Sequence, residues 1–346
     1  MLAARLHEYD ETFSRSEILR LEEVPEPQVE EPDDVIVRIG GAGLCRSDLH
    51  IIDGSLRSQL NTPLPIILGH ENAGWVHAVG DMVRTVKPGD PVIVHLVITD
   101  GVCPACRRGE DMHCAGLKFP GIDTDGGFAQ FLRVKERSVL KLPAGLDPKE
   151  AAPYADAGLT SYRAARKAAA ILRPGMSAVI IGFGGLGHVG AQILRVLCAA
   201  RITIVDVSTA ALELASQLGF TELVHGGPGA VEEVRRLTGG GADAVLDFVG
   251  EKGTPEQAIG MLRSGGTYFV IGLGGILQVP TAALVAGEYS IVGSLAGNFS
   301  DLREVIALAA EGRVRIALRF YPLSEINQAI HDLAAGRIAG RAVLVP

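Results

Sequence analysis

Features that would direct this chain to nucleic acid, to a membrane or to secretion are absent. The 346 residues contain no run of basic side chains, only 21% are charged, and the net charge is −8. Nucleic acid and anionic lipid are therefore not expected partners. No uncharged apolar stretch reaches about 18 residues, the length that indicates a membrane-spanning helix. The first residues, MLAARLHEYDETFS, lack the apolar core of a secretory signal, so we expect a cytoplasmic protein.

Cysteine is also scarce, and it is unevenly placed. The chain has five cysteines, an odd number, and three of them (Cys103, Cys106 and Cys114) fall within twelve residues. In a reducing compartment such a cluster favours metal binding over disulfide bonds.

Glycine and apolar residues, by contrast, are abundant. There are 43 glycines, and 47% of the chain is hydrophobic, so it can bury a large core that has many tight turns. The length predicts about two domains. Residues 1–150 consist of short apolar runs between turn signals, which is typical of a small barrel-like domain. From Ala151 helices and strands alternate, which predicts a parallel, doubly wound sheet.

The pattern predicts the individual elements as follows. The strands expected in the first part are Val35–Ile39, Pro65–Leu68, Trp75–Val79, Pro91–Val97, Phe128–Val134 and Val139–Leu142. The later strands are Ala178–Ile181, Ile202–Val205, Ala244–Phe248, Thr267–Ile271, Ser290–Gly293 and Arg341–Val345. The helices are Ala151–Arg173, Ala210–Leu218, Ala230–Leu237, Pro255–Leu262, Leu302–Glu311 and Leu323–Ala335, together with one that follows the glycine cluster near residue 184.

That glycine cluster, within residues 178–206, is the clearest motif. Gly182, Gly184 and Gly187 form a G-x-G-x-x-G turn between an apolar run and a helical pattern. The first glycine permits the sharp turn, the second lets a pyrophosphate approach the backbone, and the third lets the helix pack closely. Asp206 lies 19 residues after Gly187 at the end of the next strand, where an acid can accept from a ribose 2′-hydroxyl. The motif predicts dinucleotide binding; a purely structural turn is the alternative.

A first group of candidate metal ligands lies in the N-terminal half. Cys45 and His70 offer a thiolate and an imidazole, which zinc prefers, although an isolated Cys and His are more often core and surface residues. Ser47 and His50 follow Cys45 closely. Ser47 could hydrogen-bond to whatever occupies an open zinc position, and His50 could pass that proton to solvent; otherwise both are ordinary turn residues.

A second group is the cysteine cluster itself. Cys103-x2-Cys106 and Cys114 lie in a Gly/Pro/Arg-rich loop, which indicates a structural zinc site needing four ligands. Asp100 continues the spacing and is the favoured fourth ligand. The competitors for that place are Glu110, Asp111 and His113. The alternative is a loop that keeps three reduced thiols and no metal.

Together these motifs resemble the zinc-dependent medium-chain alcohol dehydrogenases, especially the NAD-dependent archaeal and bacterial branch. The resemblance covers essentially the whole chain. It rests on Gly69-His70-Glu71-x2-Gly74-x5-Gly80-x2-Val83, on Cys45-Arg46-Ser47-Asp48-x-His50, on the cysteine loop, on the glycine turn and on the ending Gly340-Arg341-Ala-Val-Leu-Val-Pro346. It implies an α/β protein with a GroES-like β-barrel catalytic domain (residues 1–155 and 296–346) and a Rossmann doubly wound parallel-sheet coenzyme domain (residues 156–295), with the active site in the cleft between the domains.

The resemblance also implies the ligands of a catalytic zinc. Cys45 and His70 are two of them, and Asp156, in the segment Tyr154–Gly158, matches the third. Without the resemblance Asp156 would be interpreted as a helix N-terminal acid. Glu71 resembles the acid that approaches the zinc during ligand exchange, and Asp48 the partner that orients His70. At Asp100 the family more commonly has Cys, but acidic residues occur there in the archaeal branch.

The resemblance further implies NAD as the cofactor. The residues expected to bind it are Arg46, Gly182, Gly184, Gly185, Leu186, Gly187, Asp206, Val249 and Arg341. Arg46 and Arg341 would contact the pyrophosphate. The carboxylate of Asp206 would repel a 2′-phosphate, and no arginine follows it to bind one, so we expect NAD rather than NADP.

The expected reaction is reversible oxidation of a primary or secondary alcohol to an aldehyde or ketone. Zinc would act as a Lewis acid, Ser47, the nicotinamide ribose and His50 would carry the proton to solvent, and the hydride would pass to the nicotinamide. Apolar residues expected near the substrate favour hydrophobic alcohols; they are Leu96, Leu117, Phe119, Ile122 and Leu295. A polyol or sugar dehydrogenase and a non-catalytic dinucleotide-binding protein are the alternatives. By resemblance we expect a homotetramer, or else a homodimer.

Overall fold

The structure is a computed structural model that describes all 346 residues. The chain forms two compact units. The first contains Met1–Leu159, Ala296–Gly312 and Ala317–Pro346, and the second contains Thr160–Leu295 and Arg313–Ile316. The first boundary thus lies four residues later than the expected 155/156, and residues 313–316 return to the second unit. None of the helices is long and apolar enough to cross a membrane.

The first unit is built on two sheets. A seven-stranded sheet has the order β15-β16-β3-β5-β6-β8, with β7 also paired to β3, and a three-stranded sheet has the order β2-β1-β4. The strands are β1 (Leu2–Leu6), β2 (Arg20–Glu23), β3 (Asp34–Leu44), β4 (Ile66–Ile67), β5 (Glu71–Val79), β6 (Pro91–Val94), β7 (Phe131–Lys135), β8 (Val139–Lys141), β15 (Leu318–Pro322) and β16 (Arg341–Val345). One continuous apolar core joins both sheets to the C-terminal helix.

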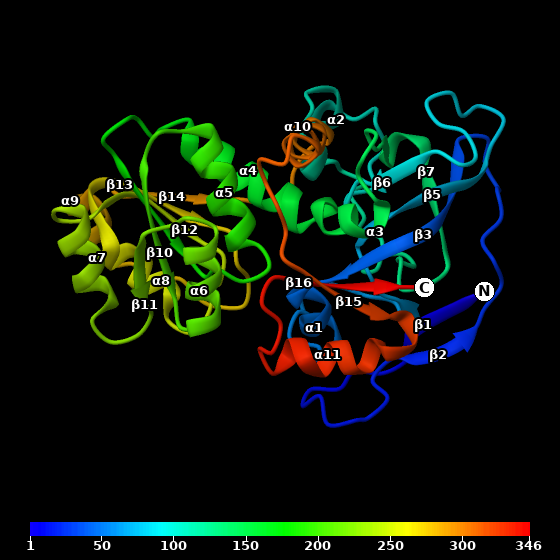
Figure 1. Cartoon of the computed structure of the whole chain (residues 1–346), viewed down its shortest axis with the longest axis horizontal. Coiled ribbons are helices and arrows are strands. Elements are labelled where there is room, and N and C mark those ends of the chain that lie inside the picture. Colours follow the sequence, from blue (N-terminus) through cyan, green and yellow to red (C-terminus); the bar gives the residue numbers. More distant parts are fainter. The chain divides into compact units, whose positions relative to one another are not determined.

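Short helices complete the first unit (Figure 1). They are α1 (Arg46–Ile52), α2 (Pro104–Arg107), α3 (Pro148–Ala151), α10 (Phe299–Ala310) and α11 (Ile326–Ala334), with 3-10 turns at Asp111–His113, Glu136–Ser138, Ala152–Ala155 and Leu323–Glu325. The C-terminal strand β16 pairs with β3 on one side and with the edge strand β15 on the other, so the last strand of the chain is part of the sheet that the N-terminal strands form.

The second unit contains a six-stranded parallel sheet, as the alternating pattern predicts. Its order is β11-β10-β9-β12-β13-β14, the doubly wound order in which dinucleotides bind at the carboxyl ends of the central strands. The strands are β9 (Ser177–Ile181), β10 (Arg201–Asp206), β11 (Glu222–His225), β12 (Ala242–Asp247), β13 (Leu262–Val270) and β14 (Ser290–Gly293). The helices are α5 (Gly187–Leu197), α6 (Thr209–Gln217), α7 (Ala230–Thr238), α8 (Thr254–Met261) and α9 (Thr281–Gly287), and they cover both faces of the sheet (Figure 1).

The expected long helix over Ala151–Arg173 is interrupted. The chain forms α3, then the 3-10 turn, and only from Ala157 the regular helix α4 (Ala157–Ala169). Asp156 lies at the break, with φ −125° and ψ −63°, outside the helical region. Pro153 contributes to the interruption because proline cannot donate to a preceding helical turn. The break frees Asp156 from the helix so that its side chain can take part in tertiary contacts.

Four strands, β1, β2, β11 and β15, are not predicted by the sequence pattern. β1 and β2 carry charged residues at positions that weaken the apolar alternation. Three predicted strands are also too short at one end by four or five residues; one of them is β13, which begins at Leu262 instead of Thr267. The other two pair with each other. β3 runs five residues beyond Ile39 through a glycine-rich stretch, and β5 begins at Glu71 instead of Trp75, because pairing between the two strands outweighs the low strand preference of glycine.

The three glycines of the turn between β9 and α5 differ in how much space surrounds them and in their backbone conformation. A Cβ on Gly187 would lie 1.7 Å from the backbone oxygen of Gly182, whereas a Cβ on Gly184 would meet no atom within 4 Å. Gly182 itself has φ +83°, a conformation that glycine adopts most readily. The third glycine is thus required for the fold, and the second leaves open space beside the backbone.

We predict that Gly187→Ala lowers stability by about 1–3 kcal/mol or more, because the added methyl group overlaps backbone. Gly184→Ala is the matched control and should leave stability unchanged within about 0.5 kcal/mol. Urea unfolding followed by circular dichroism measures both. Equal destabilisation of the two variants would show that the close approach at Gly187 does not limit stability.

Candidate functional site

Three buried side chains from distant parts of the first unit meet at one point. Cys45 directly precedes α1, His70 precedes β5, and Asp156 lies at the break before α4. One ligand atom from each lies within 4.8 Å of the others. The structure therefore brings together the three residues expected to hold the catalytic zinc.

The geometry and chemistry of this cluster fit a zinc ion. The distances from Oδ2 of Asp156 are 3.5 Å to Sγ of Cys45 and 3.6 Å to Nε2 of His70. Zinc bonds of about 2.0–2.3 Å at tetrahedral angles place ligand atoms about 3.3–3.8 Å apart. Three protein ligands leave a fourth position for a substrate, as in catalytic rather than structural zinc sites.

Asp48, the residue predicted to orient His70, lies beside its ring. Its Oδ1 lies 3.3 Å from Nδ1 of His70, at ion-pair distance although outside hydrogen-bond geometry. Its Oδ2 accepts from the Cys45 backbone N–H at 2.8 Å. Burial alone would lower the pKa of His70, but the carboxylates of Asp48 and Asp156 and the Cys45 sulfur raise it well above its usual value. A metal at Nε2 competes with this proton, so zinc binding here releases a proton.

Glu71 and Arg341 form a buried ion pair beside these ligands. Both are almost completely buried, at 0% and 3% exposure. The Arg341 guanidinium donates to both carboxylate oxygens of Glu71, from Nε at 2.9 Å and from a second nitrogen. It also lies 3.3 Å from Oδ2 of Asp156. The other donor to Glu71 is the Ala157 backbone N–H, at 2.9 Å.

This pair changes the description of two predicted residues. Glu71 lies outside the ligand cluster of Cys45, His70 and Asp156, with its carboxylate committed to Arg341. Arg341, expected at a pyrophosphate, contacts Glu71 and Asp156 within the first unit; its contact with a cofactor stays a prediction, as does an approach of Glu71 to the zinc.

The remaining polar residues of this site lie on α1. Ser47 Oγ is 3.5 Å from Sγ of Cys45, one of the candidate zinc ligands. His50 lies one turn later with its side chain 14% exposed, and Nδ1 is 3.2 Å from Ser55 Oγ. Arg46 is exposed at the first position of the helix.

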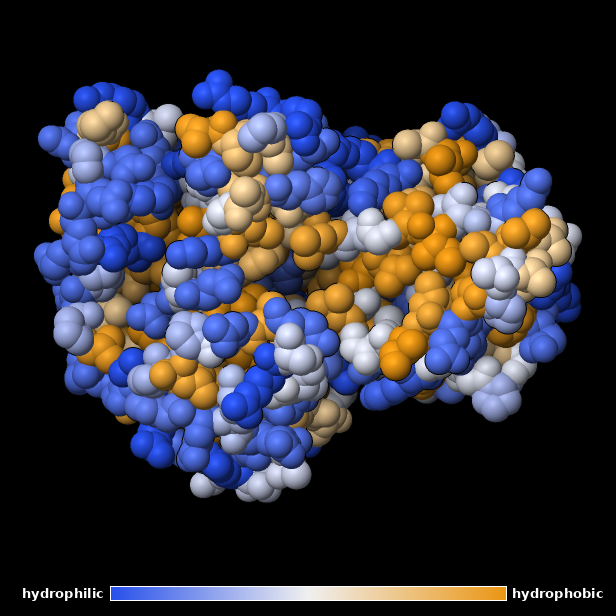
Figure 2. Space-filling model, turned by 180° about the vertical axis from the view of Figure 1, so that it is seen from behind, coloured by the Kyte–Doolittle hydropathy of each residue, from blue (hydrophilic) through white to orange (hydrophobic).

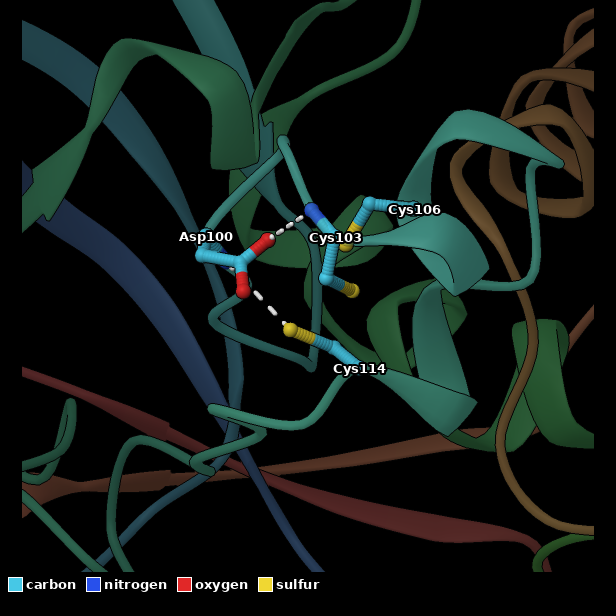
Figure 3. Close-up of side chains that lie close together, drawn as sticks. All are labelled: Asp100, Cys103, Cys106 and Cys114. Atoms are coloured by element: carbon cyan, nitrogen blue, oxygen red, sulfur yellow. Dashed lines mark hydrogen bonds between the residues drawn. The ribbon is translucent and has the colours of Figure 1, made fainter.

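The second metal group is the loop that contains the cysteine cluster. Ligand atoms of Asp100, Cys103, Cys106 and Cys114 all lie within 4.8 Å of one another, and the four side chains point toward a common centre (Figure 3). Oδ1 of Asp100 accepts the backbone N–H groups of Val102 (2.8 Å) and Cys103 (2.9 Å). One carboxylate oxygen thus fixes the loop, and the other is free to bind a metal.

The same hydrogen bonds keep Asp100 charged. The backbone N–H groups of Cys103 and Val102 lower the pKa of its carboxyl to about 2. Burial, with the neighbouring Cys114 and Cys103 thiols, raises the pKa of Cys106 to about 11. Three sulfurs and one carboxylate with no open position fit a structural zinc, which would displace the thiol protons.

The competing fourth ligands are committed elsewhere. Asp111 pairs with Arg137 at 2.8 Å through one oxygen and accepts the Phe299 backbone N–H at 2.9 Å through the other. Glu110 pairs with Arg108 at 2.9 Å. The exposed His113 lies 3.8 Å from Glu110 and outside the cluster.

Apart from Arg46 and Arg341, which belong to the first unit, the predicted dinucleotide residues lie at the carboxyl ends of the strands of the second unit. Oδ2 of Asp206 accepts the Phe183 backbone N–H of the glycine turn at 2.6 Å, and Oδ1 accepts the Ser208 N–H at 2.7 Å. Val249 packs against Gly182, where a Cβ would lie 2.5 Å from a Val249 methyl carbon. Gly184, Gly185 and Leu186 complete the turn before α5. The Asp206 carboxylate is therefore held directly beside the glycine turn.

Comparisons with known proteins agree with the candidate metal site of the first unit and with the dinucleotide-binding pattern of the second. Residues 31–144 match the family model of the alcohol dehydrogenase GroES-like domain, and residues 185–311 match the model of the zinc-binding dehydrogenases. The chain belongs to the zinc-dependent alcohol dehydrogenase family.

Individual members of the family are similar over the whole length. An NAD-dependent alcohol dehydrogenase of Sulfolobus acidocaldarius is 35% identical, with 99% of each chain covered. A D-arabinose 1-dehydrogenase (NADP(+)) of Saccharolobus solfataricus is 36% identical over 99% of this chain and 97% of its own. The crystal structure of the alcohol dehydrogenase from Aeropyrum pernix has 44% identity and a TM-score of 0.95, with 100% of both chains covered. Figure 2 shows the molecule from behind: hydrophobic residues gather in a patch on the right half of that face, and hydrophilic residues predominate over the left half.

Sequence reasoning missed two sets of interactions in this alcohol dehydrogenase. The pairing of Glu71 with Arg341 joins residues 270 positions apart, and no local pattern indicates it. The contacts of His50 with Asp53 and Ser55 could have been noticed, because an Asp-Gly-Ser sequence directly after a helix is a turn signal.

We predict that Asp100→Asn removes the structural zinc while keeping the loop's backbone hydrogen bonds, since an amide oxygen can still accept from Val102 and Cys103. Metal analysis should give about two zinc ions per wild-type chain and about one for the variant. Asp100→Cys is the matched control and should retain both, because a thiolate is a good zinc ligand. Two zinc ions in Asp100→Asn would contradict ligation by Asp100.

Proposed function

We propose that this protein catalyses the NAD-linked, zinc-dependent, reversible oxidation of primary or secondary alcohols, with a preference for hydrophobic ones. The observation that carries the proposal is the buried cluster of Cys45, His70 and Asp156, in which three ligands leave one coordination position open. The glycine turn with Asp206 supplies the complementary dinucleotide site. The relatives named as NAD-dependent alcohol dehydrogenases support the same reaction.

The residues of the first unit divide the work between metal binding and proton transfer. Zinc, when bound by Cys45, His70 and Asp156, supplies Lewis-acid polarisation of the substrate oxygen. Ser47, whose hydroxyl lies beside Cys45, accepts the proton of the substrate hydroxyl in alcohol oxidation. His50, which is partly exposed on the next turn of α1, releases that proton to solvent. In the reverse direction the same groups return it.

The residues of the second unit hold the dinucleotide. The backbone of the turn from Gly182 to Gly187 and the N-terminus of α5 bind the pyrophosphate. Contacts of Arg46 and Arg341, from the first unit, with the pyrophosphate stay predictions of the family resemblance. Asp206 accepts hydrogen bonds from the adenosine ribose, and Val249 lies beside the turn. Because the Asp206 carboxylate is fixed by two backbone N–H groups, it cannot turn away from a 2′-phosphate, which favours NAD.

We predict that Asp206→Gly lowers the preference for NAD over NADP by at least about tenfold, because like charges at contact distance cost several kcal/mol in a partly buried site. The ratio of kcat/KM for the two cofactors measures the change. Glycine also removes the acceptor for Phe183, so Asp206→Asn serves as the control that loses charge but keeps an acceptor. An unchanged ratio in both variants would mean that Asp206 does not select the cofactor.

Two classes of substrate are candidates: hydrophobic alcohols, and sugars or polyols. Leu96 and Ile122 are buried in the first unit, and Leu117 and Phe119 are partly buried there; these apolar side chains support hydrophobic alcohols. A sugar or polyol substrate is the second candidate, because a relative 36% identical over 99% of this chain is named as a D-arabinose dehydrogenase.

The function is tested by NAD reduction over primary, secondary, aromatic and polyol alcohols. We expect the highest kcat/KM with hydrophobic alcohols and no activity after zinc is removed. Cys45→Ala should lose more than about 100-fold in kcat, since metal polarisation contributes several kcal/mol, and should still bind NAD. Activity confined to sugars would favour the second candidate, and an active Cys45→Ala would exclude the proposed zinc chemistry.

We also propose assembly into a homotetramer, or a homodimer, in the cytoplasm. The edge strand β14 and its surroundings expose several large apolar side chains, which indicates a protein contact. They are Leu273, Ile276, Val285, Ile291 and Leu295. None of the five cysteines forms a disulfide bond, which suits a reducing compartment.

A further inference from the structure

The turn that follows α1 folds back onto the ring of His50. Ser55 Oγ lies 3.2 Å from Nδ1 of His50 and donates to the His50 carbonyl oxygen at 3.4 Å. Asp53, the residue that ends α1, places Oδ2 at 3.9 Å from the same Nδ1. Nδ1 of His50 thus faces the side chains of Ser55 and Asp53, whereas Nε2 contacts neither of them.

The arrangement favours one position for the proton of a neutral His50 ring. A serine hydroxyl has one proton, so Ser55 Oγ can accept from Nδ1 and donate to the His50 carbonyl oxygen, or it can donate to an unprotonated Nδ1. The Asp53 carboxylate, an acceptor only when ionised, lies 3.9 Å from Nδ1 and favours a proton there. With the proton on Nδ1, Ser55 donates to the carbonyl oxygen and the lone pair of the ring lies on Nε2.

Asp53 also holds the turn in place. Its Oδ1 accepts the Ser55 backbone N–H at 2.7 Å, the hydrogen bond of an Asx turn. Between them Gly54 has φ +73°, and its N–H donates to the Ile51 carbonyl oxygen at 3.2 Å. The position of Ser55 relative to His50 is thus fixed by backbone geometry and by one carboxylate, not by a freely rotating loop.

We propose that Asp53 and Ser55 are positioning residues that hold neutral His50 in the Nδ1–H tautomer and so present Nε2 as the proton acceptor. This rests on the proposed role of His50 in releasing the substrate proton. In alcohol oxidation the proton from the substrate hydroxyl arrives at Nε2 and forms an imidazolium ion. Asp53 stabilises that ion until the proton on Nε2 passes to water. The loss of that proton restores the neutral Nδ1–H form, and no other bond changes.

The direct test is neutron diffraction from deuterium-exchanged crystals of the whole enzyme at a pH where His50 is neutral. We expect a deuteron on Nδ1 of His50 in the wild type. In Ser55→Ala the deuteron should occupy Nε2 in part or entirely, because the acceptor at Nδ1 is lost. A wild-type deuteron on Nε2 overturns the proposal, whatever the activity of the enzyme.

The kinetic test uses the pH profile of alcohol oxidation. Ser55→Ala and Asp53→Asn should lower kcat about three- to tenfold with little change in KM, a fraction of the roughly 10²–10⁴-fold that general bases contribute. Asp53→Asn also removes the carboxylate beside the imidazolium ion, so the pH profile of the rate should differ from that of the wild type. A profile of Asp53→Asn that coincides with the wild type overturns the role of Asp53.

Two controls separate this proposal from the proposed function. Ser58→Ala alters a serine of the same segment that does not contact His50; its hydroxyl donates to the side chain of the adjacent Gln59 at 2.7 Å. This variant should match the wild type in kcat and pH profile. His50→Gln should remove the pH-dependent rise itself. If His50→Gln keeps full activity while the deuteron lies on Nδ1, the tautomer assignment stands and the relay role of His50 is wrong.

Discussion

The buried ion pair between Glu71 and Arg341 is the interaction on which the arrangement of the first unit depends. Both side chains are shielded from water, and an unpaired charge at such a place is strongly unfavourable, since loss of one partner of a buried pair costs about 3–5 kcal/mol. Glu71 begins β5, and Arg341 begins β16. The charges therefore require the last strand of the chain to lie against the early ones, next to Asp156.

The backbone around this pair is adapted to it. Gly43 of β3 lies opposite both Glu71 and Val343, and a Cβ there would lie 1.7 Å from a Glu71 carboxylate oxygen. The Ala157 N–H at the start of α4 also donates to Glu71. The helix break frees the buried Asp156 from the helix, and the absence of a side chain at residue 43 leaves room for Glu71. Together they place the Asp156 carboxylate beside Cys45 and His70 without leaving a buried charge unpaired.

The motifs that sequence reasoning could interpret are those whose geometry is local. The glycine turn, the acid at the end of β10 and the Asp100–Cys114 loop each lie within 30 residues, and the chemistry of each follows from residue type and spacing. The family resemblance added Asp156, which no spacing links to Cys45. Strand β1 and the ends of β3 and β5 escaped prediction because pairing with distant strands, rather than the apolar pattern of each segment, decides their extent.

The sequence by itself determined the two-part organisation, the parallel sheet of the second unit, the glycine turn and the identity of most candidate metal ligands. Those features depend on periodicity, on glycine positions and on the donor atoms that a residue type offers. Only the tertiary structure decided that Glu71 is committed to Arg341, that Asp111 is bound to Arg137 and Phe299 instead of a metal, and which nitrogen of His50 faces Ser55. Hydrogen bonds and ion pairs are directional and act over about 3 Å, so a chain position alone does not specify them.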